Sequence, residues 1–476
     1  MRYTTVAAIL ACSVAGAASL DSNDRQLAHD VLKQLIEINT THSVGSTTLA
    51  AQAMEDRLLA AGFPKQDMTI LGPNDKRGNL IVRYRAANPT HKPILIIAHL
   101  DVVEARREDW TTDPFQLLEK DGYFYGRGTQ DMKAADAGLV TDFIRLRRER
   151  YKPDRDMILA LTADEEGGTS NGVDWLLKHH RDLIDAEYVL NPDSGGVYTD
   201  HGRPVDVEME VTEKLYATFQ VRATNPGGHS SLPVPDNAIY RVVDALARLE
   251  RSPFPVELNA VTRAYFAKLA SAPEQTDRAD MQAMLQTPPD AAAVARLSRQ
   301  PQYNSLLHTT CVPTMMQAGH AENALPQSAV ATVNCRILPG HSAEEVRLGL
   351  VRVFADSQLI IRYMDVATGE PVDHAPDKMT FAPVLPPPAV IEPLERIAND
   401  MWPSAPVIPE METGASDSIY TIAAGIPSYG VSGLAIDRND IRAHGKDERL
   451  RMDSYYDGVE FYYRYLKALT WPKADR

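Results

Sequence analysis

Short apolar runs that alternate with helical patterns most constrain the fold of this chain. The run Ile94–Ala98, which follows Pro93, is apolar at every position, as expected of a strand buried on both faces. Three other runs are also predicted to be strands: Asn79–Tyr84, Met157–Leu161 and Tyr188–Leu190. Apolar residues recur at helical spacing before and between them, in Leu27–Ile38, Thr47–Ala61 and Ala135–Leu146. This alternation predicts an α/β domain with a mixed, largely parallel sheet and helices on both faces.

The pattern changes at Val207. Between Leu215 and Val221 apolar and polar residues alternate, which predicts a strand with one face in water. After it we expect, in chain order, a helix over Ile239–Leu249, strands over Thr309–Gly319 and Ala329–Leu338, a helix opened by the capping box of Ser342 and Glu345, and a strand over Leu359–Met364. The order β-α-β-β-α-β predicts a small α+β domain with a ferredoxin-like antiparallel sheet. The Ala-rich insertion Pro253–Pro301 is expected to be helical, and Met315 and Met316 are expected to fill core.

These two patterns divide the chain into one α/β domain that a second domain interrupts. We expect residues 19–206 to form the first part of the α/β domain, 207–368 the inserted domain and 369–476 the second part of the α/β domain. Both crossings fall in polar or Pro-containing segments, as domain boundaries usually do.

Residues 1–18 have the order of a secretory signal peptide. Arg2 supplies a basic start, an apolar stretch follows, and Ala15-Gly16-Ala17 fits the small-residue cleavage pattern. The stretch is too short to span a bilayer, so we predict export to the periplasm or the medium. An apolar first helix of the fold and a lipid anchor on Cys12 are the alternatives. No later stretch has the sequence of a membrane span.

The net charge and the cysteines limit which partners and which cellular compartment are expected. The 476 residues include 49 Lys and Arg against 64 Asp and Glu, a net charge of −15. That sign argues against nucleic acid or an anionic membrane as the main partner. Cys311 and Cys335 lie on predicted strands of one small sheet, where they would form either a disulfide or two buried thiols.

Imidazole and carboxylate side chains follow the predicted strands. In chain order they are His99 and Asp101, then Glu165 and Glu166, then Asp193. A Gly-rich turn ending at Asp131 leads into a helix. Open α/β sheets bind ligands beyond the carboxyl ends of their strands, and a divalent cation would remove the repulsion among clustered acids. Because these are oxygen and nitrogen donors, the pattern predicts a metal site.

In combination these motifs resemble the dinuclear zinc peptidases related to carboxypeptidase S, glutamate carboxypeptidase and aminoacylase, and the carboxypeptidase S branch most of all. The matching segments are His99–Val103, Trp110 with Asp113–Phe115, Tyr125–Asp131, Glu165–Gly167 and Arg442–Glu448. The resemblance implies a zinc exopeptidase-like fold in which the inserted domain is a lid and a dimerisation module.

The resemblance also implies two divalent metal ions per chain, zinc with cobalt or manganese as alternatives. It assigns His99 and Asp193 to one metal and Glu166 and His444 to the other, with Asp131 bridging them. Asp193 stands where some relatives have Glu, which leaves carboxypeptidase against dipeptidase open.

Further roles follow from the same resemblance. Glu165 would be the general base, and Asp101 would hydrogen-bond the ring of His99. The Asp131-Met132 peptide is expected to be cis.

The resemblance also assigns residues outside the metal motifs. In the lid, His229 would stabilise the oxyanion, either of its own chain's site or of the partner's site across a dimer interface. Asn323 and Arg336 match the family's site for a substrate carboxylate, and Gly414 lies in a loop that would line the pocket.

The sequence thus predicts an exported dinuclear exopeptidase that cleaves the amide bond next to a free carboxylate. An N-acyl-amino-acid amidohydrolase, which would use the same residues, is the nearest alternative. A non-catalytic peptide-binding protein and a mononuclear metal site are the others. The expected partners are a small peptide or N-acyl amino acid and a second copy of the chain.

Overall fold

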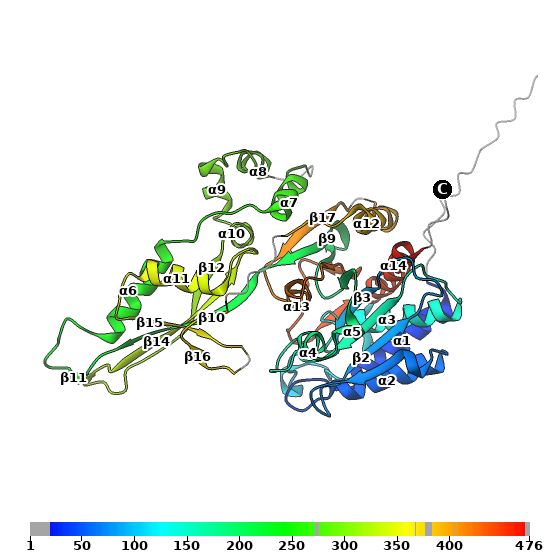
Figure 1. The fold of residues 1–476 in the computed structure, drawn as a ribbon, viewed down its shortest axis with the longest axis horizontal. Helices are drawn as coiled ribbons and strands as arrows, with labels where there is room; N and C mark the ends of the chain where they lie inside the picture. Colours follow the sequence, from blue (N-terminus) through cyan, green and yellow to red (C-terminus); the bar gives the residue numbers. More distant parts are fainter. Residues whose placement is uncertain (1–19, 272–275, 367, 377–382, 404, 472–476) are drawn as a thin grey trace, which may run out of the picture.

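The computed structural model describes residues 20–271, 276–366, 368–376, 383–403 and 405–471. Figure 1 shows an α/β domain and a smaller, elongated domain joined side by side, with a group of short helices beside their junction. The predicted signal peptide, residues 1–18 with Cys12, lies outside the described residues. Within the described ranges, no helix is both long enough and apolar enough to cross a membrane.

The α/β domain is built on a ten-stranded mixed sheet. Across this sheet the strands are β1 (Met68–Leu71), β2 (Asn79–Tyr84), β6 (Met157–Thr162), β3 (Ile94–His99), β7 (Tyr188–Asn191), β18 (Ser428–Gly430), β9 (Arg203–Glu213), β8 (Gly196–Asp200) and β19 (Ala435–Asp437), with β17 (Val407–Glu412) also paired to β9. Strands β6, β3, β7 and β18 run parallel to one another. Their carboxyl ends therefore meet at one edge, and the predicted mixed, largely parallel sheet is confirmed.

Helices cover both faces of this sheet, because the side chains of its strands point alternately to either side. In β3, Ile94 and Ile96 pack into one core and Leu95 and Ile97 into another. The helices of the first core include α1 (Ser22–Glu37), α2 (Thr47–Ala60), α3 (Lys133–Arg148), α12 (Pro388–Met401) and α14 (Met452–Thr470). Those of the second are α4 (Gly172–His179), α5 (Arg181–Ile184) and α13 (Ser418–Ala423).

The smaller domain has the predicted β-α-β-β-α-β order. Its antiparallel sheet runs β12 (Thr310–Ala318), β14 (Ser328–Ile337), β10 (Leu215–Thr224), β15 (Ile360–Met364) and β16 (Pro371–Val372). Helices α6 (Ala238–Arg251) and α11 (Ala343–Phe354) pack on one face of it, and the capping box of Ser342 and Glu345 opens α11. The insertion is helical, with α7 (Ala260–Ser271), α8 (Arg278–Met284), α9 (Ala291–Leu297) and α10 (Pro301–Leu307).

Short elements complete the description. A three-stranded sheet joins β20 (Arg449–Arg451), β5 (Tyr123–Tyr125) and β4 (Leu118–Lys120), and a two-stranded sheet joins β11 (Gly228–His229) and β13 (Ala324–Leu325). Short 3-10 helices lie at η1 (Lys65–Asp67) and η2 (Arg107–Asp109).

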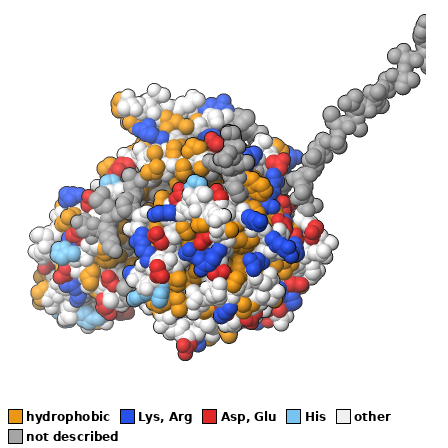
Figure 2. Space-filling model, turned by 45° about the vertical axis from the view of Figure 1, so that its right-hand side comes forward, with side chains coloured by type: hydrophobic (Ala, Val, Ile, Leu, Met, Phe, Trp, Pro, Cys, Tyr) orange, Lys and Arg blue, Asp and Glu red, His pale blue; other side chains and the backbone are white. Residues whose placement is uncertain are grey.

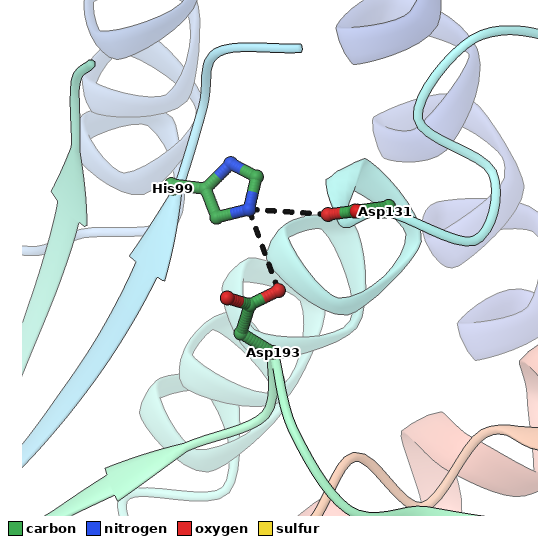
Figure 3. Close-up of side chains that lie close together, drawn as sticks. All are labelled: His99, Asp131 and Asp193. Atoms are coloured by element: carbon green, nitrogen blue, oxygen red, sulfur yellow. Dashed lines mark ion pairs between the residues drawn. The ribbon is translucent and has the colours of Figure 1, made fainter. Parts of the chain in front are cut away.

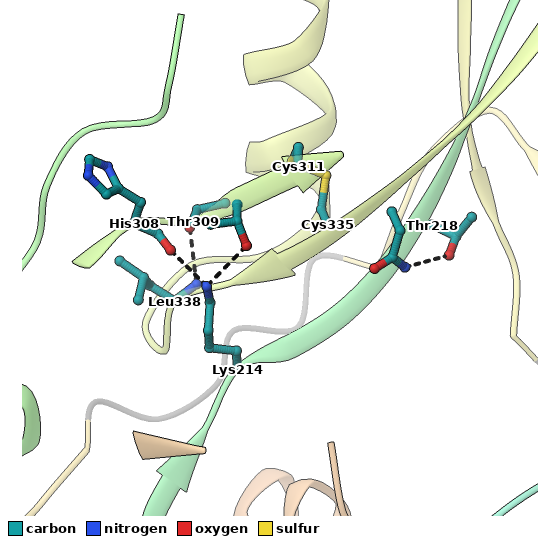
Figure 4. Close-up of a disulfide and its surroundings, with 9 residues drawn as sticks. Lys214, Thr218, His308, Thr309, Cys311, Cys335 and Leu338 are labelled. Atoms are coloured by element: carbon teal, nitrogen blue, oxygen red, sulfur yellow. Dashed lines mark hydrogen bonds between the residues drawn. A yellow bond between two sulfur atoms is a disulfide. The ribbon is translucent and has the colours of Figure 1, made fainter. Parts of the chain in front are cut away.

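The change from one sheet to the other falls at Lys214 rather than at Val207, because β9 continues the large sheet to Glu213. The buried Lys214 Nζ donates to the carbonyl oxygens of Ser305 (2.8 Å) and His308 (2.7 Å), as Figure 4 shows for His308. Lys214 therefore connects the end of the helical insertion, through hydrogen bonds, to the segment that joins the two domains.

Two sequence expectations about the small domain have definite outcomes. Cys311 and Cys335 form a disulfide between β12 and β14 (Figure 4). Met315 and Met316 do not fill core: they are 63% and 43% exposed on β12, which among the described residues is an edge strand paired with β14. The pattern missed this because an edge strand can carry apolar side chains on its open face.

Charged side chains of both signs are mixed over the face of the molecule seen in Figure 2. The acidic excess of the sequence is therefore not gathered into one acidic surface on that face.

Candidate dinuclear metal centre

Five side chains from distant stretches of the chain meet beyond the carboxyl ends of the parallel strands. They form two groups of potential metal ligands, His99 with Asp131 and Asp193, and Glu166 with Asp131 and His444. Asp131 belongs to both groups. In each group the ligand atoms all lie within 4.8 Å of one another.

The carboxylate of Asp131 faces a histidine on each side. Its Oδ1 lies 3.2 Å from Nε2 of His99, and its Oδ2 lies 3.0 Å from Nε2 of His444. Asp193 Oδ1 completes the first group at 3.4 Å from His99, and Glu166 Oε2 the second at 2.9 Å from His444. Figure 3 shows the His99 ring directed between Asp131 and Asp193. The carboxylate of Asp131 therefore lies between two sets of potential donors.

These side chains are better suited to bind divalent cations than to form hydrogen bonds with one another. Among the described residues, Nε2 of His99, Oδ1 of Asp131 and Oε1 of Glu166 are buried without a hydrogen-bond partner. Buried polar atoms are rarely left unpaired unless an ion or a ligand completes them. Imidazole nitrogen and carboxylate oxygen are the donors that zinc and similar cations bind.

The local fold accounts for these positions. His99 is the last residue of β3, Glu166 follows β6, and Asp193 follows β7. Asp131 precedes α3, and its peptide bond to Met132 is cis, as expected. His444 comes from the opposite end of the chain, in the loop that leads into β20.

Mutual electrostatics favour the charged forms of Asp131 and His444 when no cation is present. Hydrogen bonds to Asp131 and then to Glu166 raise the pKa of His444 to about 10. Burial works to raise the pKa of Asp131, but the neighbouring His444 and His99 outweigh it and lower that pKa below its ordinary range. The centre is therefore built around negative charge that needs a cationic neighbour.

Glu165 and Asp101 lie beside this centre. Burial raises the pKa of Glu165 well above its ordinary range. The ring Nδ1 of His99 lies 3.0 Å from the backbone carbonyl oxygen of Asp101 but 3.8 Å from its carboxylate, so the expected carboxylate–ring hydrogen bond is not formed. The Asp101 carboxylate instead accepts the backbone N–H groups of Glu165 (3.2 Å) and Glu166 (3.0 Å). It holds the loop that carries the expected base.

The predicted substrate residues lie at three different places. Gly414 is in the loop before α13, close to the metal ligands, because Ser416 of that loop accepts a hydrogen bond from Asn191, two residues before Asp193. Arg336 is near the end of β14, at the crossing between the domains. Its guanidinium lies over the ring of Tyr216, 4.8 Å from the centroid.

His229 and Asn323 are together, but not at the metal centre. The N–H of Ser230 donates to the backbone carbonyl of Asn323 (3.1 Å), and β11 pairs with β13. Figure 1 shows β11 at the end of the small domain farthest from β3. Within one chain, the structure does not bring His229 to the metal ligands.

Sequence reasoning gave no separate role to two buried residues beside the centre. Asp417 accepts hydrogen bonds from Thr162 (3.2 Å) and Asn171 (2.5 Å), and Glu448 lies under the Asp131 loop. Asp417 is in the predicted pocket loop, and Glu448 is in the late histidine motif. Their place in those motifs was therefore the available signal.

A family model, Peptidase family M20/M25/M40, matches residues 95–468. The chain belongs to this family. It is accordingly a metallopeptidase or amidohydrolase, an enzyme that hydrolyses peptide or amide bonds. The sequence-based resemblance and the enzyme class are both confirmed.

Individual relatives show two kinds of named activity. The N-fatty-acyl-amino acid synthase/hydrolase PM20D1 of Xenopus tropicalis is 27% identical over 413 residues, which cover 85% of this chain and 78% of that protein. The probable carboxypeptidase S-like 2 of Dictyostelium discoideum is 27% identical over 400 residues, covering 82% and 74%. An M20 family metallo-carboxypeptidase of Sulfolobus solfataricus has the same fold, with a TM-score of 0.65 at 16% identity, covering 94% of this chain and 99% of that one.

Proposed function

We propose that this M20 protein is a dinuclear metal-dependent exopeptidase that hydrolyses the amide bond next to a free carboxylate. The observation that carries the proposal is the sharing of Asp131 by two groups of potential ligands, with Glu165 next to the ligand Glu166. Zinc is the proposed metal, with cobalt and manganese as alternatives.

The residues around the centre have different proposed roles in hydrolysis. When bound, two cations would polarise the scissile carbonyl and lower the pKa of the attacking water. Glu165 is half-buried and fixed through its backbone to Asp101. Its carboxylate takes the proton from that water and returns it to the leaving amine. Burial, which raises the pKa of Glu165, favours its holding the proton between these two steps.

Arg336 is the proposed anchor for the substrate carboxylate. Its Nη1 is buried with no hydrogen-bond partner among the described residues. A guanidinium binds a carboxylate through two parallel hydrogen bonds. The free donor therefore supports recognition of a substrate that ends in an amino acid carboxylate.

A second candidate differs in the acyl half of the substrate. The relatives include both a carboxypeptidase S-like protein and an N-fatty-acyl-amino acid hydrolase. We propose N-acyl amino acids as the alternative substrates, because both classes present the same amide next to a free carboxylate.

A hydrolysis screen tests both functions. The enzyme would be loaded with zinc, cobalt or manganese and given dipeptides, longer peptides and N-acyl amino acids of increasing chain length. Each substrate would be paired with its C-terminal amide. We expect cleavage of at least one free-acid class and much slower cleavage of its amide. Equal rates on acids and amides, or no cleavage with any metal, would contradict the proposal.

Export and dimerisation are part of the proposal. The pattern of residues 1–18 and the Cys311–Cys335 disulfide support an oxidising compartment. Val312 and Met315 on the edge strand β12 are 54% and 63% exposed, which supports a homodimer formed through the small domain. Sequencing the N-terminus of the mature protein tests export. Light scattering of the native chain and of Met315→Glu tests the dimer.

A further inference from the structure

Two loops far apart in the sequence are held together by hydrogen bonds beside the candidate metal centre. The first runs from β5 to α3 and ends at Asp131, and the second leads through His444 to β20. The strands at their bases pair, with Arg449 opposite Tyr125. Each loop thus contributes one ligand to the group that contains Glu166.

The side chain of Glu448 receives four hydrogen bonds from the first loop. Its Oε1 accepts the backbone N–H groups of Gln130 (2.6 Å) and Asp131 (3.1 Å), and its Oε2 accepts the N–H of Gly128 (3.2 Å) and Nη1 of Arg127 (2.5 Å). The side chain has no exposed surface. The carboxylate oxygens of Glu448 are therefore fully hydrogen-bonded by the segment that positions Asp131.

Arg127 completes the connection in the other direction. Its Nη2 donates to the carbonyl oxygen of Gly445 at 3.0 Å and lies 3.5 Å from that of His444. Arg127 is 2% exposed, and its guanidinium lies 5.1 Å from the centroid of the Trp110 ring. A buried cation of this kind needs a buried anion, and Glu448 is the carboxylate that it contacts.

Gln130 joins the loops at a second place. Its Nε2 donates to the carbonyl oxygens of Arg449 (2.8 Å) and Asp440 (3.2 Å). Its Oε1 accepts the backbone N–H groups of Arg442 (2.8 Å) and Ala443 (2.9 Å). The segment before His444 is thereby held to the residue before Asp131.

We propose that Glu448 is a positioning residue, which sets Asp131 and His444 at the separation that the second metal requires. Glu448 touches neither metal nor substrate, and acts through the backbone of the Asp131 loop and through Arg127. The inference rests on the proposed dinuclear centre. On this inference, Glu448 determines how tightly the metal at His444 is bound, and the overall fold does not depend on it.

Glu448→Gln is the decisive variant, because a neutral amide keeps the size of the side chain. Its NH2 group would face two N–H donors, and Arg127 would lose its anion. Removing a partner that orients metal ligands usually lowers metal affinity by about 10–100-fold. We expect that loss for one of two cobalt ions in calorimetry, together with a lower kcat and little change in KM. A mainly raised KM with unchanged metal affinity would overturn the assignment.

Asp24→Asn is the matched control. Asp24 is also a buried carboxylate that pairs with arginines, Arg145 and Arg148, but at the other end of α3. We expect this variant to lose thermal stability with no change in cobalt affinity. If Glu448→Gln and Asp24→Asn lost stability alike and both bound two cobalt ions normally, Glu448 would be a structural residue only.

Gln130→Ala keeps the test decisive if Glu448→Gln does not fold. Gln130 is only partly buried, and its truncation removes the second connection between the loops. It should weaken the same metal in the folded protein, and unchanged affinity would contradict the inference. Native protein that bound fewer than two cobalt ions would instead contradict the proposed function.

Discussion

Replacing Glu165 with Gln separates base catalysis from metal binding. Neither group of potential ligands includes Glu165, and its anchor to Asp101 is a backbone hydrogen bond that Gln would keep. A positioned general base contributes about 10²–10⁴-fold to the rate, which corresponds to about 3–5 kcal/mol of transition-state stabilisation. We therefore expect kcat to fall by that factor with metal content unchanged.

The assay needs metal analysis and kinetics on the same samples. Glu166→Gln is the comparison variant, since Glu166 belongs to the second group of ligands and its replacement should remove metal as well as activity. If Glu165→Gln kept more than about a tenth of the native kcat, or lost metal as Glu166→Gln does, Glu165 would not be the base.

Other consequences can be measured separately. Arg336→Ala should slow cleavage of free-acid substrates far more than that of their amides, and an equal loss on both would exclude its role in carboxylate binding. Cys311 and Cys335 are 24 residues apart, so the double Ser variant should lose about 3 kcal/mol of unfolding free energy in urea; an unchanged midpoint would contradict this. The pKa of His444 is raised to about 10 without metal, and only neutral imidazole binds metal. The affinity for metal should therefore rise with pH up to that value, by about tenfold per pH unit for each proton released. Calorimetry in two buffers of different ionisation enthalpy would show no proton release if this is wrong.

The central strands could be predicted because burial on both faces leaves an unbroken apolar run. The predicted strand Asn79–Tyr84 matches β2, and Ile94–Ala98 differs from β3 only by His99. The pattern failed for β9, where Glu208 and Glu210 are buried. These acids stand between the apolar residues of β9 and change the pattern from Val207 on, so the change of sheet was placed before its actual position at Lys214.

The candidate ligands could be proposed from the sequence because His99, Glu166 and Asp193 lie at or after the ends of predicted strands, and because Asp131 and His444 lie in motifs that resemble those of the family. The partners of those ligands were not, since they depend on how loops pack. The carboxylate of Asp101 is two residues from His99, which suggested that it binds that ring. Only the folded loop shows the N–H groups of Glu165 and Glu166 in its place.

The separation of Arg336 from His229 within the small domain limits how the enzyme can work. Arg336 lies near the end of β14, paired with Tyr216 at the start of β10, whereas β11, the strand that contains His229, is at the far end of the small domain in Figure 1. One small substrate held by Arg336 in the same chain cannot also contact His229. The contribution proposed for His229 therefore requires either movement of the small domain or a second copy of the chain. The exposed apolar edge of β12 favours the second copy, because joining two small domains would cover it. If the native protein were a monomer in solution, His229 would have to act through domain movement or not at all.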